Sequence, residues 1–189
     1  MRFVVPFVLG ALLAACSSLP ERAEPAEYLD QRTGATVTVV DHPLVFARDR
    51  SERAANVRDY ITAVASSINR AGKIQYLWVV YVWSTLDAQA GATTSAANVV
   101  ITADDRRIAL LPVGVNAVEA GISVPVQAPA HVTAISQVFA TDLPTLRFVA
   151  AARSVRMQVS ADAGAPYYEL WDDQRESLSR FVRFASGER

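Results

Sequence analysis

Short runs of β-branched and aromatic residues recur along the chain and predict a mainly β fold. Residues 36–40 (TVTVV) are β-branched throughout, and a further short run follows at 44–46 after the break at His42-Pro43. The strongest segment is 74–84 (IQYLWVVYVWS), which is apolar on both faces of a strand. Because such a strand needs cover on both sides, we predict that it lies in the centre of a sheet.

The remaining elements are shorter. Residues 98–111 predict a hairpin that turns at 103–106 (ADDR), and further strands are predicted at 131–139, 155–159 and 167–170. Asp142 is positioned to cap a helix over 143–152. Asp173 and Glu176 have the spacing of a capping box, which predicts a C-terminal helix over 174–185.

The segment 53–69 is ambiguous. Its apolar residues have helical spacing, yet 60–64 (YITAV) reads equally well as a strand. Residues 69–73 (NRAGK) have the composition of a hairpin turn directly before the strongest strand, which favours a strand here. The predicted fold is therefore α+β and mainly β: an antiparallel sheet or β-sandwich with one or two covering helices, including the C-terminal one.

The N-terminus has the pattern of an export signal. Arg2 precedes an apolar run over 3–15, which as a helix spans about 20 Å, short of the roughly 30 Å of a bilayer core. Leu13-Ala14-Ala15-Cys16 resembles the lipobox of bacterial lipoproteins. The resemblance implies a signal peptide over 1–15, cleavage before Cys16 and lipid attachment to Cys16. The alternative is an ordinary secretion signal that leaves Cys16 as a free thiol.

Three regions follow from this interpretation. After the signal peptide, residues 16–27 form the lipidated Cys16 and a flexible tether, and residues 28–189 form a single globular domain. Ser17 follows the cysteine where an Asp would be the usual inner-membrane retention signal. We therefore expect a cell-envelope lipoprotein, lipid-anchored in the outer membrane and facing the periplasm.

A second resemblance covers much of residues 28–171. Its motifs are loose, and they lie at Tyr28-Leu29-Asp30, 33–39, 43–48, Arg58-Asp59-Tyr60, Asn69 with Gly72, and 83–85. In these the chain resembles a family of uncharacterised exported lipoproteins from Gram-negative bacteria. The resemblance implies a strand from Asp59 to Asn69 and supplies no activity.

Composition narrows the function classes. Hydrophobic residues make up 51% of the 189, which excludes a disordered chain. With 18 basic and 19 acidic residues, the chain has no basic excess for binding nucleic acid. One Cys excludes an intramolecular disulfide, and with only two His a zinc site is also improbable. We predict no cofactor and no metal.

Candidate catalytic groups are few. Only His42 and His131 could act as imidazole bases, and no Gly-x-Ser-x-Gly motif is present. Asp104-Asp105 and Asp172-Asp173 are carboxylate pairs, but a hairpin turn and a helix N-terminus explain them more simply. We predict no catalytic site and expect that the protein is not an enzyme.

Three further features bear on binding. Seven aromatic residues have strand spacing, which favours packing in the core over the lining of a ligand groove. They are Tyr76, Trp78, Tyr81, Trp83, Tyr167, Tyr168 and Trp171. Arginines alternate with acids from Arg48 through Arg50 and Arg53 to Arg58, which predicts a solvated face of ion pairs. The apolar loop 114–129 could bind a partner or pack back onto the sheet.

From these features we expect a non-enzymatic protein that binds another envelope protein or has a structural role. The alternative is a periplasmic carrier that binds lipid or another small molecule in an apolar pocket, and a hydrolase is a third possibility. The ligand-binding residues of such a carrier are unknown from sequence.

Overall fold

The computed structural model describes residues 24–51, 57–85, 98–114, 116–123, 126–130, 134–160 and 164–188. The predicted signal peptide, Cys16, Arg53 and His131 lie outside these residues.

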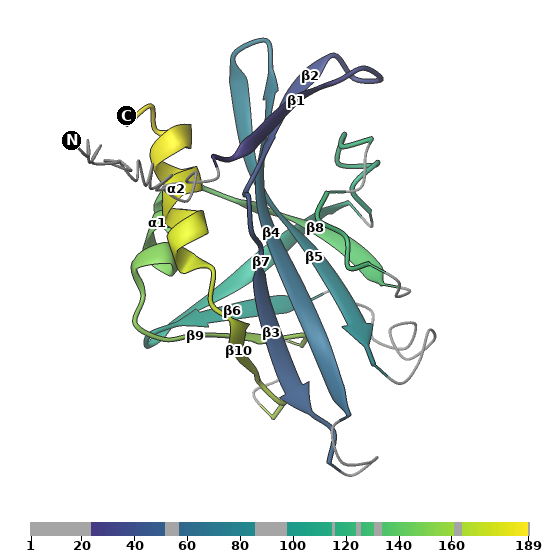
Figure 1. Cartoon of the computed structure of the whole chain (residues 1–189), viewed down its shortest axis with the longest axis vertical. Helices are drawn as coiled ribbons and strands as arrows, with labels where there is room; N and C mark the ends of the chain where they lie inside the picture. The colour runs from purple at the N-terminus through teal and green to yellow at the C-terminus, as the bar shows by residue number, and fades with distance from the viewer. Residues whose placement is uncertain are drawn as a thin grey trace, which may run out of the picture.

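Ten strands and two helices make up the described part of the chain (Figure 1). Their bounds are β1 Ala26–Asp30, β2 Ala35–Val39, β3 Leu44–Asp49, β4 Arg58–Arg70, β5 Lys73–Ser84, β6 Val99–Ala103, β7 Arg106–Gly114, β8 Ile135–Thr141, α1 Leu143–Ala151, β9 Val155–Gln158, β10 Tyr168–Asp172 and α2 Arg175–Ala185. The mainly β composition with a C-terminal helix confirms the predicted class.

The sheet closes into an eight-stranded antiparallel barrel, so the β-sandwich that the sequence left open is wrong. Going round the barrel, the strand order is β3, β10, β9, β6, β7, β8, β5 and β4, and β4 pairs again with β3. Strand β5 pairs with β4 on one edge and with β8 on the other, which joins the two ends of the sheet. Each strand of the barrel therefore has two neighbours, and no two separate sheets face each other.

The inside of the barrel is identified by following opposed residues from strand to strand. Residues directly opposite in an antiparallel pair point to the same face, so the register defines one continuous inner face. That face carries the largest buried side chains, among them Trp78, Phe139, Ile101, Met157, Phe46 and Ile61. Large apolar side chains thus fill the middle of the described barrel interior, and the same register places Arg48 and Asp59 on the inner face where β3 ends and β4 begins.

Both helices lie at one end of the barrel, which we call the helix end. Helix α1 connects the end of β8 to the start of β9, and α2 follows β10. These strand termini lie at the same end because neighbouring strands run antiparallel. The two helices lie side by side and contact each other (Figure 1). Their apolar side chains are buried in the same core cluster.

The helix starts differ in how far they match prediction. Asp142 caps α1 as predicted, since its carboxylate accepts a hydrogen bond from the Thr145 N–H at 2.7 Å. The predicted capping box of Asp173 and Glu176 is wrong, because α2 begins one residue later with Gln174 as its N-cap. Asp173 instead accepts hydrogen bonds from the backbone and guanidinium of Arg175.

The ambiguous segment is a strand from Arg58 onward, as the hairpin-turn argument favoured, and its residues 53–56 lie outside the described ranges. Strand β4 spans 13 residues and forms a continuous hairpin with β5 through Ala71 and Gly72. Both turn residues have positive φ, 50° and 86°, which is the pattern of a type I′ turn that matches the twist of the strands. The amide of Gly72 donates to the Asn69 side chain at 2.9 Å.

An additional hairpin packs against the barrel. Strand β1 begins at Ala26, so the last two residues of the predicted tether pair with β2 in the sheet. Strand β2 in turn pairs with the C-terminal part of β4, beyond the part that pairs with β3. The hairpin therefore extends the sheet at the helix end of β4.

Candidate functional site

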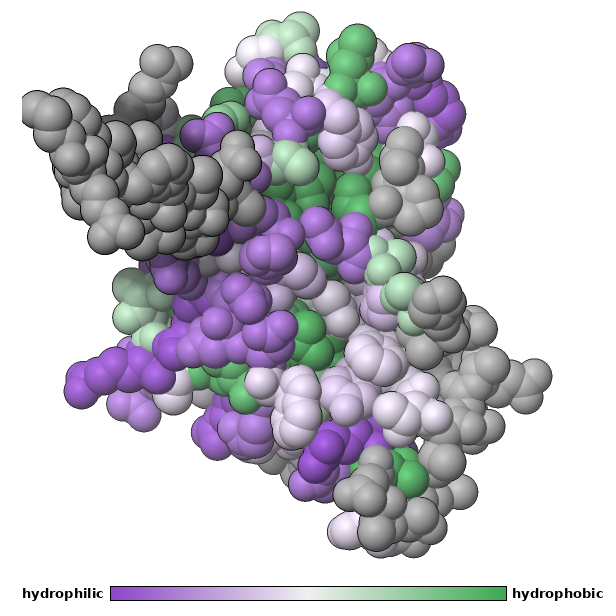
Figure 2. Space-filling model, viewed as in Figure 1, coloured by the Kyte–Doolittle hydropathy of each residue, from purple (hydrophilic) through white to green (hydrophobic). Residues whose placement is uncertain are grey.

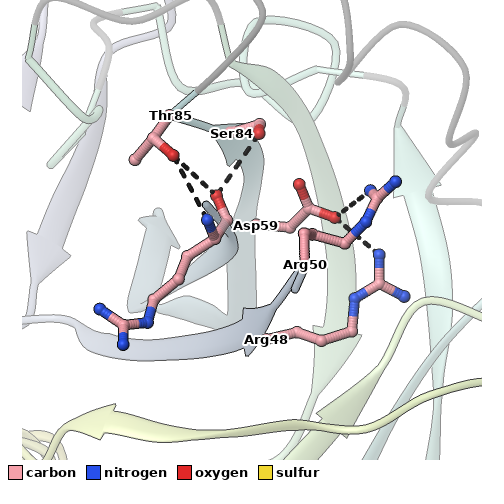
Figure 3. Close-up of polar contacts among 6 residues, drawn as sticks. Arg48, Arg50, Asp59, Ser84 and Thr85 are labelled. Carbon is pink, nitrogen blue, oxygen red and sulfur yellow. Dashed lines mark hydrogen bonds and ion pairs between the residues drawn. The ribbon is translucent and has the colours of Figure 1, made fainter. Parts of the chain in front are cut away.

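A polar cluster lies at the end of the barrel opposite the helices, which we call the far end. Here β3 ends, β4 begins, and Arg48 and Asp59 stand directly opposite each other in the register. Arg48 Nη2 and Arg50 Nη1 both donate to Asp59 Oδ2, at 2.6 and 2.7 Å. Figure 3 shows the two guanidinium groups converging on this one carboxylate.

The surroundings fix the cluster in place. Ser84 and Thr85, at the end of β5, donate hydrogen bonds to the backbone carbonyl of Arg58 (Figure 3). The Arg48 guanidinium also stands 5.0 Å from the centre of the Tyr168 ring. These contacts join β3, β4, β5 and β10 at the far end.

The electrostatics of Asp59 favour its charged form. Burial raises the pKa of its carboxyl, but the hydrogen bonds from Arg50 and Arg48 outweigh burial and leave the pKa below its usual value. A carboxylate that already accepts from two guanidinium groups is a poor general base. The predicted ion pairs are confirmed for Arg48, Arg50 and Arg58, while Arg53 lies outside the described residues, and Asp59 is buried rather than solvated.

The polar hollow beside this cluster is wide and open. Its volume is about 350 Å³, and its lining consists of Arg48, Asp49, Arg50 and Pro166. Asp49 is itself paired with the Arg58 side chain at 2.6 Å. This hollow therefore differs from the apolar pocket that a lipid carrier would need.

An aromatic cluster lies on the outer face of the barrel. The rings of Tyr60 and Trp83 stack at 4.2 Å with an angle of 12° between their planes. Trp171 meets Tyr60 edge-on at 6.4 Å, and the Arg58 guanidinium lies 4.4 Å from the centre of the Trp171 ring. We call Tyr60, Trp83, Trp171 and Arg58 the aromatic cluster.

This cluster is partly buried and reaches the surface mainly at Trp171. The Trp171 residue is 56% exposed, whereas the Trp83 indole is partly buried and donates to Thr62 Oγ1 at 3.1 Å. Figure 2 shows a pale patch of intermediate hydropathy over the lower part of β3, β4 and β5, next to hydrophilic residues in purple. The core packing predicted for the aromatic residues is thus confirmed for Trp78, Tyr81 and Tyr168 and is wrong for Trp171.

Sequence reasoning missed Tyr60 as a member of this cluster, although the signal was present. A two-residue turn at 71–72 places residue 60 directly opposite residue 83 in the β4–β5 hairpin. The stacking of Tyr60 on Trp83 could therefore have been predicted from the turn. The contact of Trp171 with Tyr60 could not have been predicted, because it depends on the pairing of β10 with β3.

No protein-family model, curated protein or solved structure matches the chain.

The other candidate residues have mainly structural surroundings. His42 is exposed, and its neighbour Asp41 pairs with Arg180 of α2 at 2.5 Å. Asp104 lies in the predicted turn and accepts hydrogen bonds from the Arg153 and Ser154 amides, both at 3.0 Å. Asp172 ends β10. None of these contacts joins a carboxylate of the Asp104-Asp105 pair to one of the Asp172-Asp173 pair.

The apolar loop packs back onto the sheet where it is described. Ile122 and Val126 are buried, and the Tyr81 hydroxyl donates to the Val126 carbonyl at 2.8 Å. The buried Asp30 carboxylate accepts the Ser123 amide at 2.6 Å and the amides of Arg32 and Thr33. These hydrogen bonds hold the pKa of Asp30 well below its usual value, and they tie the loop to the β1–β2 hairpin.

Within the described ranges, no group of three or more His, Cys, Asp or Glu side chains is placed to hold a metal ion. Neither α1 nor α2 has the length and hydrophobicity needed to cross a bilayer.

Proposed function

We propose that the chain is a lipoprotein, anchored through acylated Cys16 to the outer membrane, whose barrel binds another protein of the cell envelope. The barrel acts as a rigid support for a binding surface and not as an enzyme. The observation that carries the proposal is the aromatic cluster on the outer face of β4, β5 and β10, which is partly buried at Tyr60 and Trp83 and exposed at Trp171.

The composition of the cluster supports protein binding. Trp, Tyr and Arg are the residues most enriched among those that contribute strongly to protein–protein affinity. Here the stacking of Tyr60 on Trp83 and the guanidinium over Trp171 hold the side chains in place before any partner arrives. A preformed surface loses less conformational entropy on binding than a flexible one.

The interior of the barrel also supports this proposal over a carrier. Trp78, Phe139 and Phe46 occupy the described part of the lumen, where a carried lipid would otherwise lie. The polar cluster at the far end has its carboxylate engaged by Arg48 and Arg50. The outer surface is therefore the better candidate for function.

The anchor is tested by intact mass and membrane fractionation of the wild type against Cys16→Ser. We expect a mature mass that starts at Cys16 with added acyl chains, and loss of membrane association in the variant. A soluble wild-type protein with a free thiol would refute the anchor.

The binding surface is tested by site-specific photo-crosslinking in intact cells. A photoreactive residue at Glu169, which shares the outer face of β10 with Trp171, is expected to crosslink a defined partner, and Trp171→Ala is expected to abolish that product. The matched control is Leu111, an exposed apolar residue on β7, where no such product is expected. If the yield of crosslinked product is the same in Trp171→Ala as in the wild type, the aromatic cluster is not the binding surface.

A further inference from the structure

The helix end of the barrel carries two exposed apolar side chains close together. Ile74 follows the β4–β5 turn and is 51% exposed, and Phe184 is near the end of α2 and is 44% exposed. Both line one small hollow of about 140 Å³, together with Glu27 of β1. Figure 1 shows the start of β1 beside α2 at this end of the molecule.

Charged residues surround these apolar side chains. Lys73 precedes Ile74 and Arg183 precedes Phe184, and both basic residues are exposed. Glu24, Glu27 and Glu188 are exposed acidic residues of the same region, and Arg70, opposite Lys73 in the hairpin, is a third exposed basic residue. A surface of apolar tips beside long basic side chains is typical of contact with a lipid headgroup region, where the basic groups extend to water and phosphate.

The described part of the chain begins at Glu24, close in sequence to this surface. Eight peptide steps separate Cys16 from Glu24, and each spans at most about 3.6 Å, so an anchored Cys16 lies within about 29 Å of Glu24. Glu24 is in turn only three residues from Glu27 in the hollow. By contrast, the far end lies about 40 Å along β4 from the β4–β5 turn, at about 3.3 Å per residue.

We propose that the helix end, centred on Ile74 and Phe184, docks on the lipid surface that holds the anchor. This inference rests on the proposed acylation of Cys16. Docking fixes the barrel upright, so that the far end points away from the bilayer and the aromatic cluster stays accessible to a protein partner. The acyl chains supply the attachment, and the docked surface supplies the orientation.

The single cysteine makes a direct test possible. Once Cys16 is acylated, a cysteine introduced elsewhere is the only free thiol and takes a polarity-sensitive fluorophore. The acylated full-length protein would be labelled at Ile74→Cys or Phe184→Cys and reconstituted in phosphatidylethanolamine–phosphatidylglycerol vesicles. Ser51→Cys is the matched control, because Ser51 is exposed, lies at the far end and is nearly isosteric with Cys.

We expect labels at residues 74 and 184 to shift to shorter emission wavelength and to be quenched several-fold more by quencher-bearing lipids than the label at residue 51. Equal quenching at all three positions, whether strong or absent, would overturn the docked orientation. Failure of the anchor is seen separately, since the wild type would then label at Cys16 and would not float with the vesicles. A protein that floats with unquenched labels at 74 and 184 retains the anchor and refutes only the docking.

Discussion

The ion pair between Asp41 and Arg180 is predicted to hold α2 against the barrel. Asp41 lies between β2 and β3, and its side chain is 5% exposed, while that of Arg180 is 17% exposed. Arg180 Nη2 donates to Asp41 Oδ2 at 2.5 Å and to Ser177 Oγ at 2.7 Å. Arg180→Met removes the positive charge, keeps most of the side-chain volume and leaves the buried Asp41 carboxylate without its cation, although the Ser177 hydroxyl still donates to it at 3.4 Å.

The expected cost follows from the burial. Removing one partner of a buried ion pair destabilises proteins by about 3–5 kcal/mol, because the remaining charge is left uncompensated. Since Arg180 is partly reached by water, the lower value of about 3 kcal/mol applies. For a chain of this size, that corresponds to a fall in Tm of about 6–12 °C.

The measurement is urea unfolding of the wild type and the variant, followed by tryptophan fluorescence. The matched control is Arg147→Met, because Arg147 pairs with Glu188 at 3.0 Å between exposed side chains of the same helical layer. Exposed ion pairs contribute about 1 kcal/mol or less. If Arg180→Met costs no more than Arg147→Met, the buried pair does not hold α2 and the reasoning is wrong.

Three further predictions concern local interactions. The lowered pKa of Asp59 means that the unfolded chain, with a carboxyl pKa of about 3.9, binds the proton more readily. The stabilisation from Asp59 is thus present above about pH 4 and lost as pH falls through the folded-state pKa, so Asp59→Asn is expected to flatten the acid limb of a stability–pH curve. Asp142→Ala is expected to cost about 1 kcal/mol in urea unfolding, whereas Gln174→Ala costs almost nothing because Gln174 makes no side-chain cap. Ala71→Asn is expected to raise the unfolding free energy by about 0.5–1 kcal/mol, since Ala71 has φ of 50° and Asn tolerates that conformation better.

Each of these has a result that would contradict it. An unchanged acid limb in Asp59→Asn would mean that Arg48 and Arg50 do not stabilise the carboxylate. Equal costs at the two helix N-caps would remove the role of the Thr145 hydrogen bond. A loss of stability in Ala71→Asn would argue against the type I′ turn.

Local chemistry made the strands predictable, while the closure of the barrel depended on contacts between distant segments. The β4–β5 hairpin followed from the turn residues Ala71 and Gly72 and from the apolar faces of 74–84. The sequence also indicated that β5 is covered on both faces, as the burial of Leu77 and Trp78 shows. On the outer face, Tyr81 of β5 donates to the Val126 carbonyl of the apolar loop, and Asp30 holds Ser123 of the same loop.

The site was less predictable for the same reason. Alternating charges indicated ion pairs but not which residues form them, because the pairing of Arg48 with Asp59 needs the β3–β4 register. Strand spacing alone predicted that the aromatic residues pack in the core. It does not show which face of a closed barrel is exposed to water. Trp171 lies two residues after Glu169, which is opposite Ala47 on the outer face, so its place at the surface follows only once the pairing of β10 with β3 is known.

The seam between β3 and β10 determines when the protein can finish folding. Glu169 lies opposite Ala47, so segments from the first and last parts of the chain must meet before the barrel closes. The β4–β5 hairpin joins neighbours in sequence and can form early, but ladders between distant segments form slowly. A chain that stops before Tyr168 keeps β3 and β9 as open edges, whose unpaired backbone groups are free to pair with other chains. The last strand to be synthesised is therefore the one that protects the others from aggregation.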